Sequence, residues 1–338
     1  MKKLLFTILF LTLGTAWGGA REDAQAAVDR KDYATAFKLW RPLAEQGHAQ
    51  AQYKLGFMYN FGQGVTRDYQ EAVKWYRLAA GQGNADAQTH LGYMHFNGQG
   101  VTRDYQEAVR LYRLAAEQGN AFSQTNLGMM YSQGWGVTQD YKEAVRLYRL
   151  AAEQGDGVGQ YNLGDKYEKG QGVLQDHKEA FKWYRLAAEQ GDNTQAQYSL
   201  GVMYDKGHGV TKDHKEAIRL YRLAAEQGNE LAQTRLGIIH YLGLRVTQDH
   251  KEAFKWYRLA AEQGNAHAQY LLGHMYDNGQ GVLQDYVRAH MWYNLASAAG
   301  DASATENRDK VAKLMTPQQI QKAQEMAKAC QASNFKGC

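Results

Sequence analysis

Cysteine and proline are scarce in this chain. Its 338 residues include 2 Cys and 2 Pro, and neither Cys belongs to a CxxC motif or a Cys/His cluster. So few cysteines exclude a disulfide-dense scaffold and argue against a structural zinc site, and we therefore expect no metal and no cofactor. The 35 Gly, without abundant Pro and without a three-residue period, exclude a collagen-like chain and a Pro-rich disordered chain.

Residues 1–20 have the pattern of a secretory signal peptide. Lys2 and Lys3 precede the apolar run 4–13, and the small residues that follow place cleavage between positions 18 and 21. The run is shorter than the roughly 20 residues that span a bilayer, which disfavours the alternative of an uncleaved anchor. We therefore expect an exported protein without a transmembrane segment after cleavage, located in the periplasm, with secretion or surface association as alternatives.

The charge balance excludes one class of partner. Removal of Lys2 and Lys3 changes 39 basic residues to 37, against 35 acidic ones, so the formal net charge falls from +4 to about +2. A chain this close to neutral shows no electrostatic footprint for nucleic acid, and we expect no nucleic-acid partner.

The rest of the chain is an internal repeat. Glycines that follow Glu-Gln or a close variant recur every 36 residues, with one interval of 37, from Gly47 to Gly300. Periods of this length are typical of solenoids and propellers. We expect an N-terminal capping repeat at residues 21–46, and C-terminal capping helices with a tail at residues 300–338. The seven full units between them span residues 47–82, 83–118, 119–154, 155–190, 191–227, 228–263 and 264–299.

Each unit contains two amphipathic segments. Ala51, Leu55 and Met58 recur at spacings of three and four, and the second segment repeats this pattern around Tyr76. This spacing predicts two helices in every unit and an all-α fold. Asp68 and its equivalents precede the second segment, where a carboxylate can cap the free amides of a helix. A single hairpin cannot bury its apolar face alone, so neighbouring hairpins must stack.

These residues resemble the Sel1-like repeat family, which is related to tetratricopeptide repeats. The resemblance rests on the loop Gly-Gln-Gly-Val at residues 62–65 and the second-helix sequence Trp-Tyr-Arg-Leu-Ala-Ala at residues 75–80, and it covers about residues 33 to 300. It implies an exported bacterial member with an α/α superhelical solenoid whose first helices line a concave groove. It further implies a monomeric scaffold that binds a protein or an extended peptide, as an adaptor in envelope assembly, signalling or host contact.

Two units depart from the pattern. Arg245 stands where the second loop glycine belongs, so we expect a different turn in that loop. Gly157 and Gly159 fall together at the start of one predicted first helix. Because glycine weakens a helix, we expect that unit to be the softest of the array.

One stripe on the predicted first helices changes from unit to unit, whereas the hairpin-building positions hardly vary. The stripe lies two before, one after and four after the glycine of the Leu-Gly pair, and these positions share a helix face. We expect an apolar, aromatic N-terminal section, an acidic centre and a mixed C-terminal section, which together bind the partner. The alternative is drift on an unconstrained solvent face. The predicted binding residues are Phe57, Tyr93, Phe96, Met129, Asp165, Glu168, Asp205, Ile238 and Tyr241.

The C-terminal tail raises two further questions. Cys330 and Cys338 lie eight residues apart in a chain expected to be exported, and we expect a disulfide, with two free thiols as the alternative. Some cysteine-rich members of the resembled family are described as binding or weakly hydrolysing β-lactams, and Ser333 and Lys336 form a Ser-x-x-Lys match. No Lys-Thr-Gly or Ser-Asp-Asn partner accompanies it, so we expect no catalytic residue and keep the hydrolase as the alternative function.

Three histidines replace a repeated tyrosine and invite a metal interpretation. His177, His214 and His250 occupy the position held by Tyr69 in its own unit. Equivalent positions in stacked repeats lie roughly 10 Å apart, too far to share one ion. We therefore expect partly buried side chains in place of tyrosine.

Overall fold

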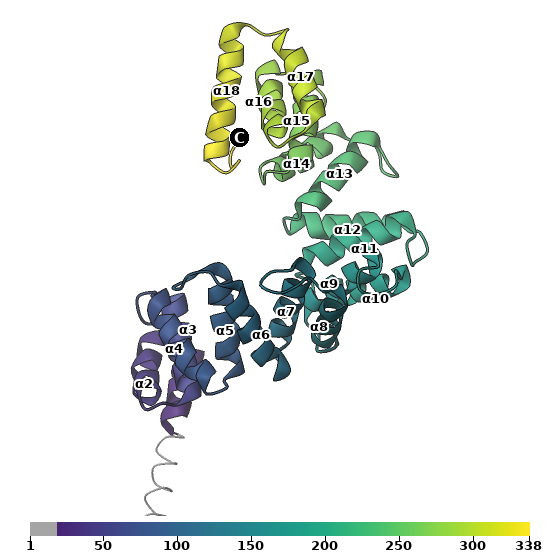
Figure 1. Cartoon of the computed structure of the whole chain (residues 1–338). Helices are drawn as coiled ribbons and strands as arrows, with labels where there is room; N and C mark the ends of the chain where they lie inside the picture. The colour runs from purple at the N-terminus through teal and green to yellow at the C-terminus, as the bar shows by residue number, and fades with distance from the viewer. Residues whose placement is uncertain (1–18) are drawn as a thin grey trace, which may run out of the picture. The chain divides into compact units, whose positions relative to one another are not determined.

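The computed structural model describes residues 19–338, so the predicted signal peptide lies outside the described residues except for positions 19 and 20. Every regular element in this part of the chain is a helix, which confirms the all-α prediction (Figure 1). Residues 19–29 are helical and precede α2 (Tyr33–Glu45). None of the described helices is long and apolar enough to cross a membrane.

Seven consecutive pairs of helices follow α2 along the described chain, and six of them pack as hairpins, the exception being α9 with α10, which belong to different units. Their first helices are α3 (Ala49–Phe61), α5 (Ala85–Asn97), α7 (Ala121–Gln133), α9 (Gly157–Lys169), α11 (Thr194–Lys206), α13 (Glu230–Leu242) and α15 (Ala266–Asn278). Their second helices are α4 (Tyr69–Gly81), α6 (Tyr105–Glu117), α8 (Tyr141–Glu153), α10 (His177–Glu189), α12 (His214–Glu226), α14 (His250–Ala261) and α16 (Tyr286–Ala298). The chain ends in α17 (Ala302–Ala312) and α18 (Pro317–Ala332).

The helix ends follow from the repeated capping residues. The carboxylate of Asp68 accepts hydrogen bonds from the backbone amides of Gln70 and Glu71, at 2.9 and 3.0 Å, as the sequence predicts. The first helix of the same hairpin ends at Gly62, whose φ of 69° lies in the left-handed region. Glycine adopts this conformation without steric cost, so it ends the helix sharply and turns the chain toward α4.

A glycine in each first helix sets how closely the two helices of a hairpin approach. A Cβ added at Gly56 would lie 2.7 Å from the ring of Tyr76, which is itself fully buried. Tyr76 and the alanines beside it therefore pack directly on the backbone of the first helix. The same Gly-Tyr contact recurs in both units, for example between Gly237 and Tyr257, so each of these hairpins contributes one layer to the core of its own unit.

Amide side chains connect the two helices of a hairpin to each other and to the helix that precedes the hairpin. Gln82 donates from Nε2 to Oε1 of Gln52 at 2.7 Å, and Gln52 donates from its own Nε2 to the carbonyl oxygen of Ala44 at 3.2 Å. The pairs that continue this ladder are Gln118 with Gln88, Gln154 with Gln124, Gln227 with Gln197, and Gln263 with Gln233. Buried amides between repeats are thus hydrogen-bonded, as polar groups in a core must be.

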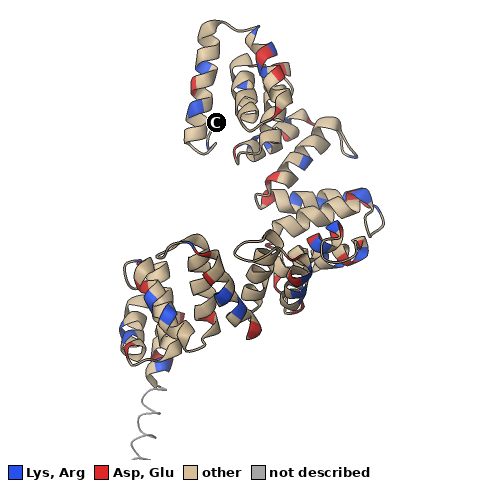
Figure 2. Ribbon diagram, viewed as in Figure 1, with Lys and Arg blue, Asp and Glu red and all other residues tan. Residues whose placement is uncertain are grey.

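The chain divides into two compact units at residues 175 and 176. Unit 1 contains α2 to α9, and each hairpin packs on the next. Unit 2 contains α10 to α18, in which α16 packs against both α17 and α18. Charged residues of both signs are interspersed along the helices of each unit (Figure 2).

The loop with Arg245 corrects a prediction. Arg245 has a φ of 61°, close to the 71° of Gly64 at the same position, so the loop keeps the left-handed backbone instead of adopting a different turn. A Cβ at Gly64 would lie 2.1 Å from the carbonyl oxygen of Tyr33 in the preceding hairpin. Where Arg245 replaces glycine, a cavity of about 50 Å³ lies between the loop and the preceding hairpin, lined in part by His214 and Tyr221.

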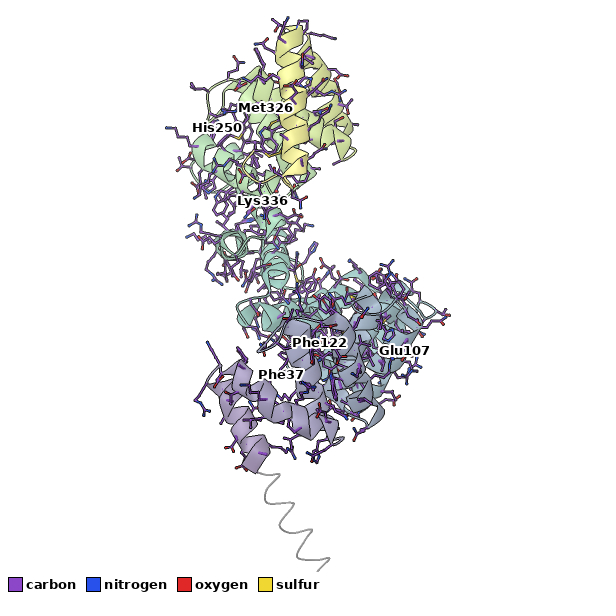
Figure 3. All side chains as sticks on the ribbon, turned by 90° about the vertical axis from the view of Figure 1, so that its left-hand side faces the viewer. Phe37, Glu107, Phe122, His250, Met326 and Lys336 are labelled. Carbon is purple, nitrogen blue, oxygen red and sulfur yellow. A yellow bond between two sulfur atoms is a disulfide. The ribbon has the colours of Figure 1, made fainter. Side chains whose placement is uncertain are left out.

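The tail closes the end of unit 2. Thr316 and Gln319 form a capping box at the start of α18, and Met326 packs against the core of this unit (Figure 3). Cys330 and Cys338 form a disulfide with Cα atoms 5.6 Å apart. Within the closed segment, the ring of Phe335 lies against the turn at Gly264. The tail is thereby fastened to the hairpin that precedes it.

Candidate functional site

The predicted aromatic section lies in unit 1, and its members differ in exposure. Phe57 is half-buried, packs against the core, and lies 4.4 Å from Phe61 between ring centroids. Phe96 is half-buried against Tyr105 and Trp135. Met129 is half-buried as well, whereas Tyr93 is 43% exposed. Of the four predicted residues, Tyr93 presents the largest free surface.

The predicted acidic centre is largely neutralised within each unit. Asp165 accepts from the ammonium of Lys169 at 2.6 Å, and both residues belong to α9. Asp205 pairs with Arg235 and accepts from Nδ1 of His214 at 2.8 Å. Glu168 is half-buried. The stripe therefore does not present the bare acidic surface that these residue types suggest.

The Asp205 cluster shows why its carboxylate stays charged. Partial burial raises the pKa of Asp205, but hydrogen bonds from Arg235 and His214 outweigh that effect and hold the pKa below its ordinary value. The guanidinium of Arg235 also lies over the ring of Tyr221, 6.0 Å from its centroid. Asp205 thus connects α11 with α12 and α13 in unit 2. These contacts account for its position without a bound ligand.

The mixed section in unit 2 is also partly occupied by internal contacts. Ile238 and Tyr241 are half-buried and pack against the core of that unit. The hydroxyl of Tyr241 donates to Oε1 of Gln280 at 2.7 Å, and its ring lies 5.1 Å from His250. These two residues join neighbouring hairpins more than they present a free surface.

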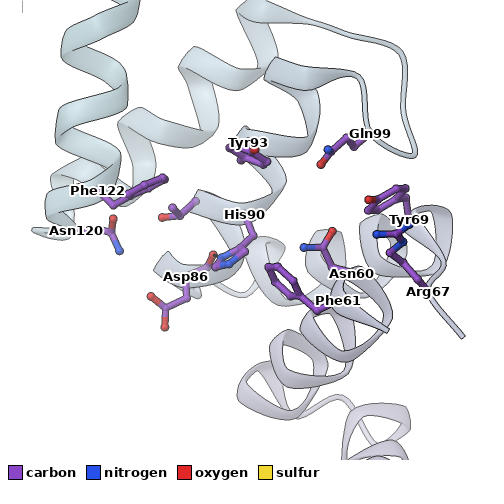
Figure 4. Close-up of a pocket in the computed structure, with 11 residues that line it drawn as sticks. Asn60, Phe61, Arg67, Tyr69, Asp86, His90, Tyr93, Gln99, Asn120 and Phe122 are labelled. Carbon is purple, nitrogen blue, oxygen red and sulfur yellow. Dashed lines mark hydrogen bonds between the residues drawn. The ribbon is translucent and has the colours of Figure 1, made fainter. Parts of the chain in front are cut away.

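A pocket of about 610 Å³ opens on the first-helix face of unit 1 (Figure 4). Three successive first helices, α3, α5 and α7, contribute to its walls, and aromatic side chains make most of them apolar. The aromatic residues are Phe61, Tyr69, Tyr93 and Phe122, and the main polar ones are Asn60, Arg67, Asp86 and His90. Of the predicted binding residues, Tyr93 lines this pocket.

His90 occupies the middle of the pocket in Figure 4, between Asp86 and Phe61. Its Nδ1 lies 2.9 Å from the carbonyl oxygen of Asp86, and a carbonyl can only accept, so Nδ1 carries the hydrogen. Burial lowers the pKa of His90, and this outweighs the hydrogen bond that favours the charged form. The ring is therefore neutral at pH 7, and Nε2 is a hydrogen-bond acceptor.

Three aromatic rings of α3 and α4 pack against the ring of His90. The rings of Tyr53 and Tyr76 lie 5.5 and 5.3 Å from it, and Phe57 lies at 5.8 Å. Burial raises the pKa of Tyr53 to about 12, so this neighbour also stays uncharged. The floor of the pocket is thus a packed, neutral aromatic layer, which is rigid enough to position a ligand.

Two prominent residues of the pocket lie outside the predicted stripe. Phe61 is the last residue of α3 and is 54% exposed, and Phe122 is the second residue of α7 and is 50% exposed. Sequence variation between the repeat units at these two positions could have identified them. The last first-helix position holds Phe61, Asn97, Gln133, Lys169, Lys206, Leu242 and Asn278 in turn, and the second holds Gln50, Asp86, Phe122, Val158, Gln195, Leu231 and His267.

The histidines and the Ser-x-x-Lys match can be placed as well. His177, His214 and His250 are half-buried, in agreement with their interpretation as substitutes for tyrosine. No group of three metal-ligating side chains occurs among residues 19–338. Ser333 follows α18 as its C-terminal cap, and its hydroxyl lies within hydrogen-bond distance of the carbonyl oxygens of Cys330 and Lys336. Its surroundings therefore lack the helix N-terminus that would position a nucleophile.

Comparisons with known proteins agree with the repeated architecture. No curated protein matches the chain. Among solved structures, a Sel1 repeat protein from Oxalobacter formigenes is 34% identical, with a TM-score of 0.69 and coverage of 90% of this chain and 93% of the other. A protective antigen present in uropathogenic Escherichia coli strains is 35% identical, with a TM-score of 0.44 and coverage of 90% and 81%.

The family model described as the Sel1 repeat accounts for most of the chain. It matches eight consecutive stretches, at residues 23–48, 49–84, 85–120, 121–156, 157–192, 194–229, 231–265 and 266–301. Repeats of this kind generally form scaffolds that mediate protein interactions. The capped hairpins, the Gly-Tyr contacts and these matches together establish that the chain belongs to the Sel1 repeat family.

Proposed function

We propose that this chain is an exported scaffold that binds an extended segment of a protein partner on the first-helix face of unit 1. The observation that carries the proposal is the pocket of about 610 Å³, whose exposed aromatic walls come from positions that differ between repeats. Large apolar side chains in one concave patch lower solubility unless a partner covers them. Aromatic residues in a pocket are also typical of the few contacts that dominate an interface.

The proposed cellular setting rests on the sequence. The signal-peptide pattern of residues 1–20 supports export to the periplasm, with release or surface attachment as alternatives. We propose that the chain acts there as a monomeric adaptor in an envelope process or in host contact. Neither a nucleic acid nor a cofactor is required for this role.

Site-specific photo-crosslinking tests the binding face. A photoreactive phenylalanine analogue would replace Tyr93 in the pocket or, as the control, Leu114 on α6, which is also exposed but does not line it. We expect a discrete crosslinked product from position 93 in cells and none from position 114. Equal crosslinking at both positions would contradict the proposal.

A matched pair of double variants tests the aromatic walls. Phe61→Asp with Phe122→Asp should abolish the crosslink at position 93 and leave the helical circular dichroism signal unchanged, because both side chains are about half exposed. Phe57 is unsuitable for this test, since it packs against the core. The control is Leu242→Asp with Leu231→Asp, which changes the equivalent positions of unit 2 at 56% and 41% exposure. A loss of the crosslink in both variants would argue against a site in unit 1.

A further inference from the structure

The pocket contains a carboxylate that forms no ion pair with the described residues. Asp86 lies in the first turn of α5, is exposed, and forms no ion pair with any residue in the described range 19–338. This contrasts with Asp165 and Asp205, which are paired within their own units. The equivalent residues of the other full units, from Gln50 to His267, include no other acid.

Aromatic rings from two neighbouring hairpins line the same pocket as this carboxylate. Figure 4 shows His90 of α5 between Phe61 of α3 and Phe122 of α7, with Tyr93 above it and Asp86 below it, at the lower left of the pocket. Aromatic faces attract a cation, and a carboxylate beside them adds a direct charge interaction. No other full unit has an acid at the position of Asp86 together with phenylalanines at the positions of Phe61 and Phe122 in the flanking units.

Two other side chains of the pocket offer hydrogen-bond acceptors. Nε2 of the neutral His90 accepts, and Oδ1 of Asn60 is buried without a hydrogen-bond partner in the structure. The cation of the pocket, Arg67, lies over the ring of Tyr69 at 5.4 Å, on the opposite side from Asp86 in Figure 4. On the Asp86 side of the pocket the neighbouring polar side chain is the neutral amide of Asn120, so this side carries no positive charge.

We propose that the pocket takes a basic side chain, arginine or lysine, of the partner segment, with its charge at Asp86 and its aliphatic stem between the rings. This inference rests on the proposed function, because it specifies which residue of a bound segment enters the site. An N–H-rich cation neutralises the carboxylate and can donate to Nε2 of His90, and its stem covers exposed surface of the rings of Phe61 and Phe122. An uncharged apolar side chain would leave the acceptors without donors.

Small probes test the proposal without knowledge of the natural partner. N-acetyl-arginine N′-methylamide would be titrated into the purified protein and followed by amide chemical shifts of α5 in NMR spectra. The citrulline analogue is its uncharged isostere, and the glutamate analogue reverses the charge. We expect arginine to bind about five- to tenfold more tightly than citrulline, with the difference shrinking at high salt.

Variants assign the effect to Asp86. Asp86→Asn should weaken arginine binding to the level of citrulline, whereas Glu230→Gln, which removes another first-turn acid from a first helix outside the pocket, should change nothing. Equal affinity for arginine and citrulline, tighter binding of glutamate, or no effect of Asp86→Asn would each overturn the proposal. The crosslinking experiment can fail while arginine still binds the pocket, so failure of the proposed function and failure of this inference are separate results.

Discussion

The two compact units share one hairpin design but differ on their first-helix faces. In unit 1, Phe61, Tyr93 and Phe122 leave exposed rings around a pocket. In unit 2, the corresponding surface is held together by internal pairs, such as Asp205 with Arg235 and Tyr241 with Gln280. The buried positions are nearly the same in both. The difference shows that stability and binding depend on separate residue positions in this repeat.

The largest predicted effect concerns the second loop glycine, which Arg245 replaces in one loop of unit 2 and which unit 1 has at Gly64, Gly100, Gly136 and Gly172. A Cβ at Gly100 would lie 2.4 Å from the carbonyl oxygen of Tyr69. Gly100→Arg should therefore destabilise unit 1 by about 3 kcal/mol or more, from overpacking and the left-handed backbone. Urea denaturation measures the change, and a loss below about 1 kcal/mol would show that any loop can open as the Arg245 loop does.

The fold could be predicted from sequence because its determinants are local and repeated. Asp68 caps α4, Gly62 ends α3, and Gly56 admits the ring of Tyr76, and each of these residue types recurs at the same spacing. Because each hairpin contacts only its neighbours in sequence, few alternative arrangements of the repeats are possible. The turn at Arg245 was predicted wrongly because residue identity alone does not show that the surrounding contacts impose a positive φ.

The site could be predicted only in part. Variation between units indicates the first-helix face and includes Tyr93, but it does not show which charges are paired. Lys169 lies four residues after Asp165 and can be read as its partner from sequence, but the pairing of Asp205 with Arg235, 30 residues away, cannot. The contribution of Phe122 to a pocket with Phe61 depends on the stacking of three hairpins, which no single repeat encodes.

Removal of the Asp205 carboxylate tests whether the face of unit 2 is structural. Asp205→Asn should lower the free energy of unfolding of unit 2 by about 1.5–3 kcal/mol, because it leaves Arg235 without its partner. In unit 1, Asp165→Asn should cost under about 1 kcal/mol, since Lys169 is largely exposed and the buried ammonium of Lys166 keeps its hydrogen bond to Gln171. Chemical denaturation of both variants provides the comparison, and equal losses would remove this distinction between the units.

The same cluster predicts a pH dependence. The pKa of Asp205 is lowered in the folded state, so its contribution is fully present above the ordinary pKa of an aspartate and is lost as the pH falls through the lowered value. The stability difference between the wild-type protein and Asp205→Asn should therefore narrow as the pH falls below about 4. Denaturation at pH 7 and pH 3 measures it, and a constant difference would contradict this account.

A smaller effect of opposite sign is expected at Arg245. Arg245→Gly removes a side chain from a left-handed position and should stabilise unit 2 by about 1 kcal/mol. It should also let the loop close on the preceding hairpin and reduce the cavity of about 50 Å³. A crystal structure and a thermal melt of the variant would show both changes. If the variant were less stable than the wild-type protein, contacts of the Arg245 side chain would outweigh the backbone strain.

The smallest predicted effects on stability come from replacing two glycines of unit 1, Gly159 and Gly81, by alanine. Gly159 stands where Ala196 stands in unit 2, yet a Cβ there would lie 2.9 Å from both the Ala151 side chain and Oγ1 of Thr125. Gly159→Ala should thus gain almost nothing, whereas Gly81→Ala, which meets open space, should stabilise unit 1 by about 0.5 kcal/mol. Hydrogen exchange along α9 and α11 completes the comparison. Lower protection of α9 would support the predicted softness of its unit, and equal protection would show that packing around Gly159 compensates for the missing side chain.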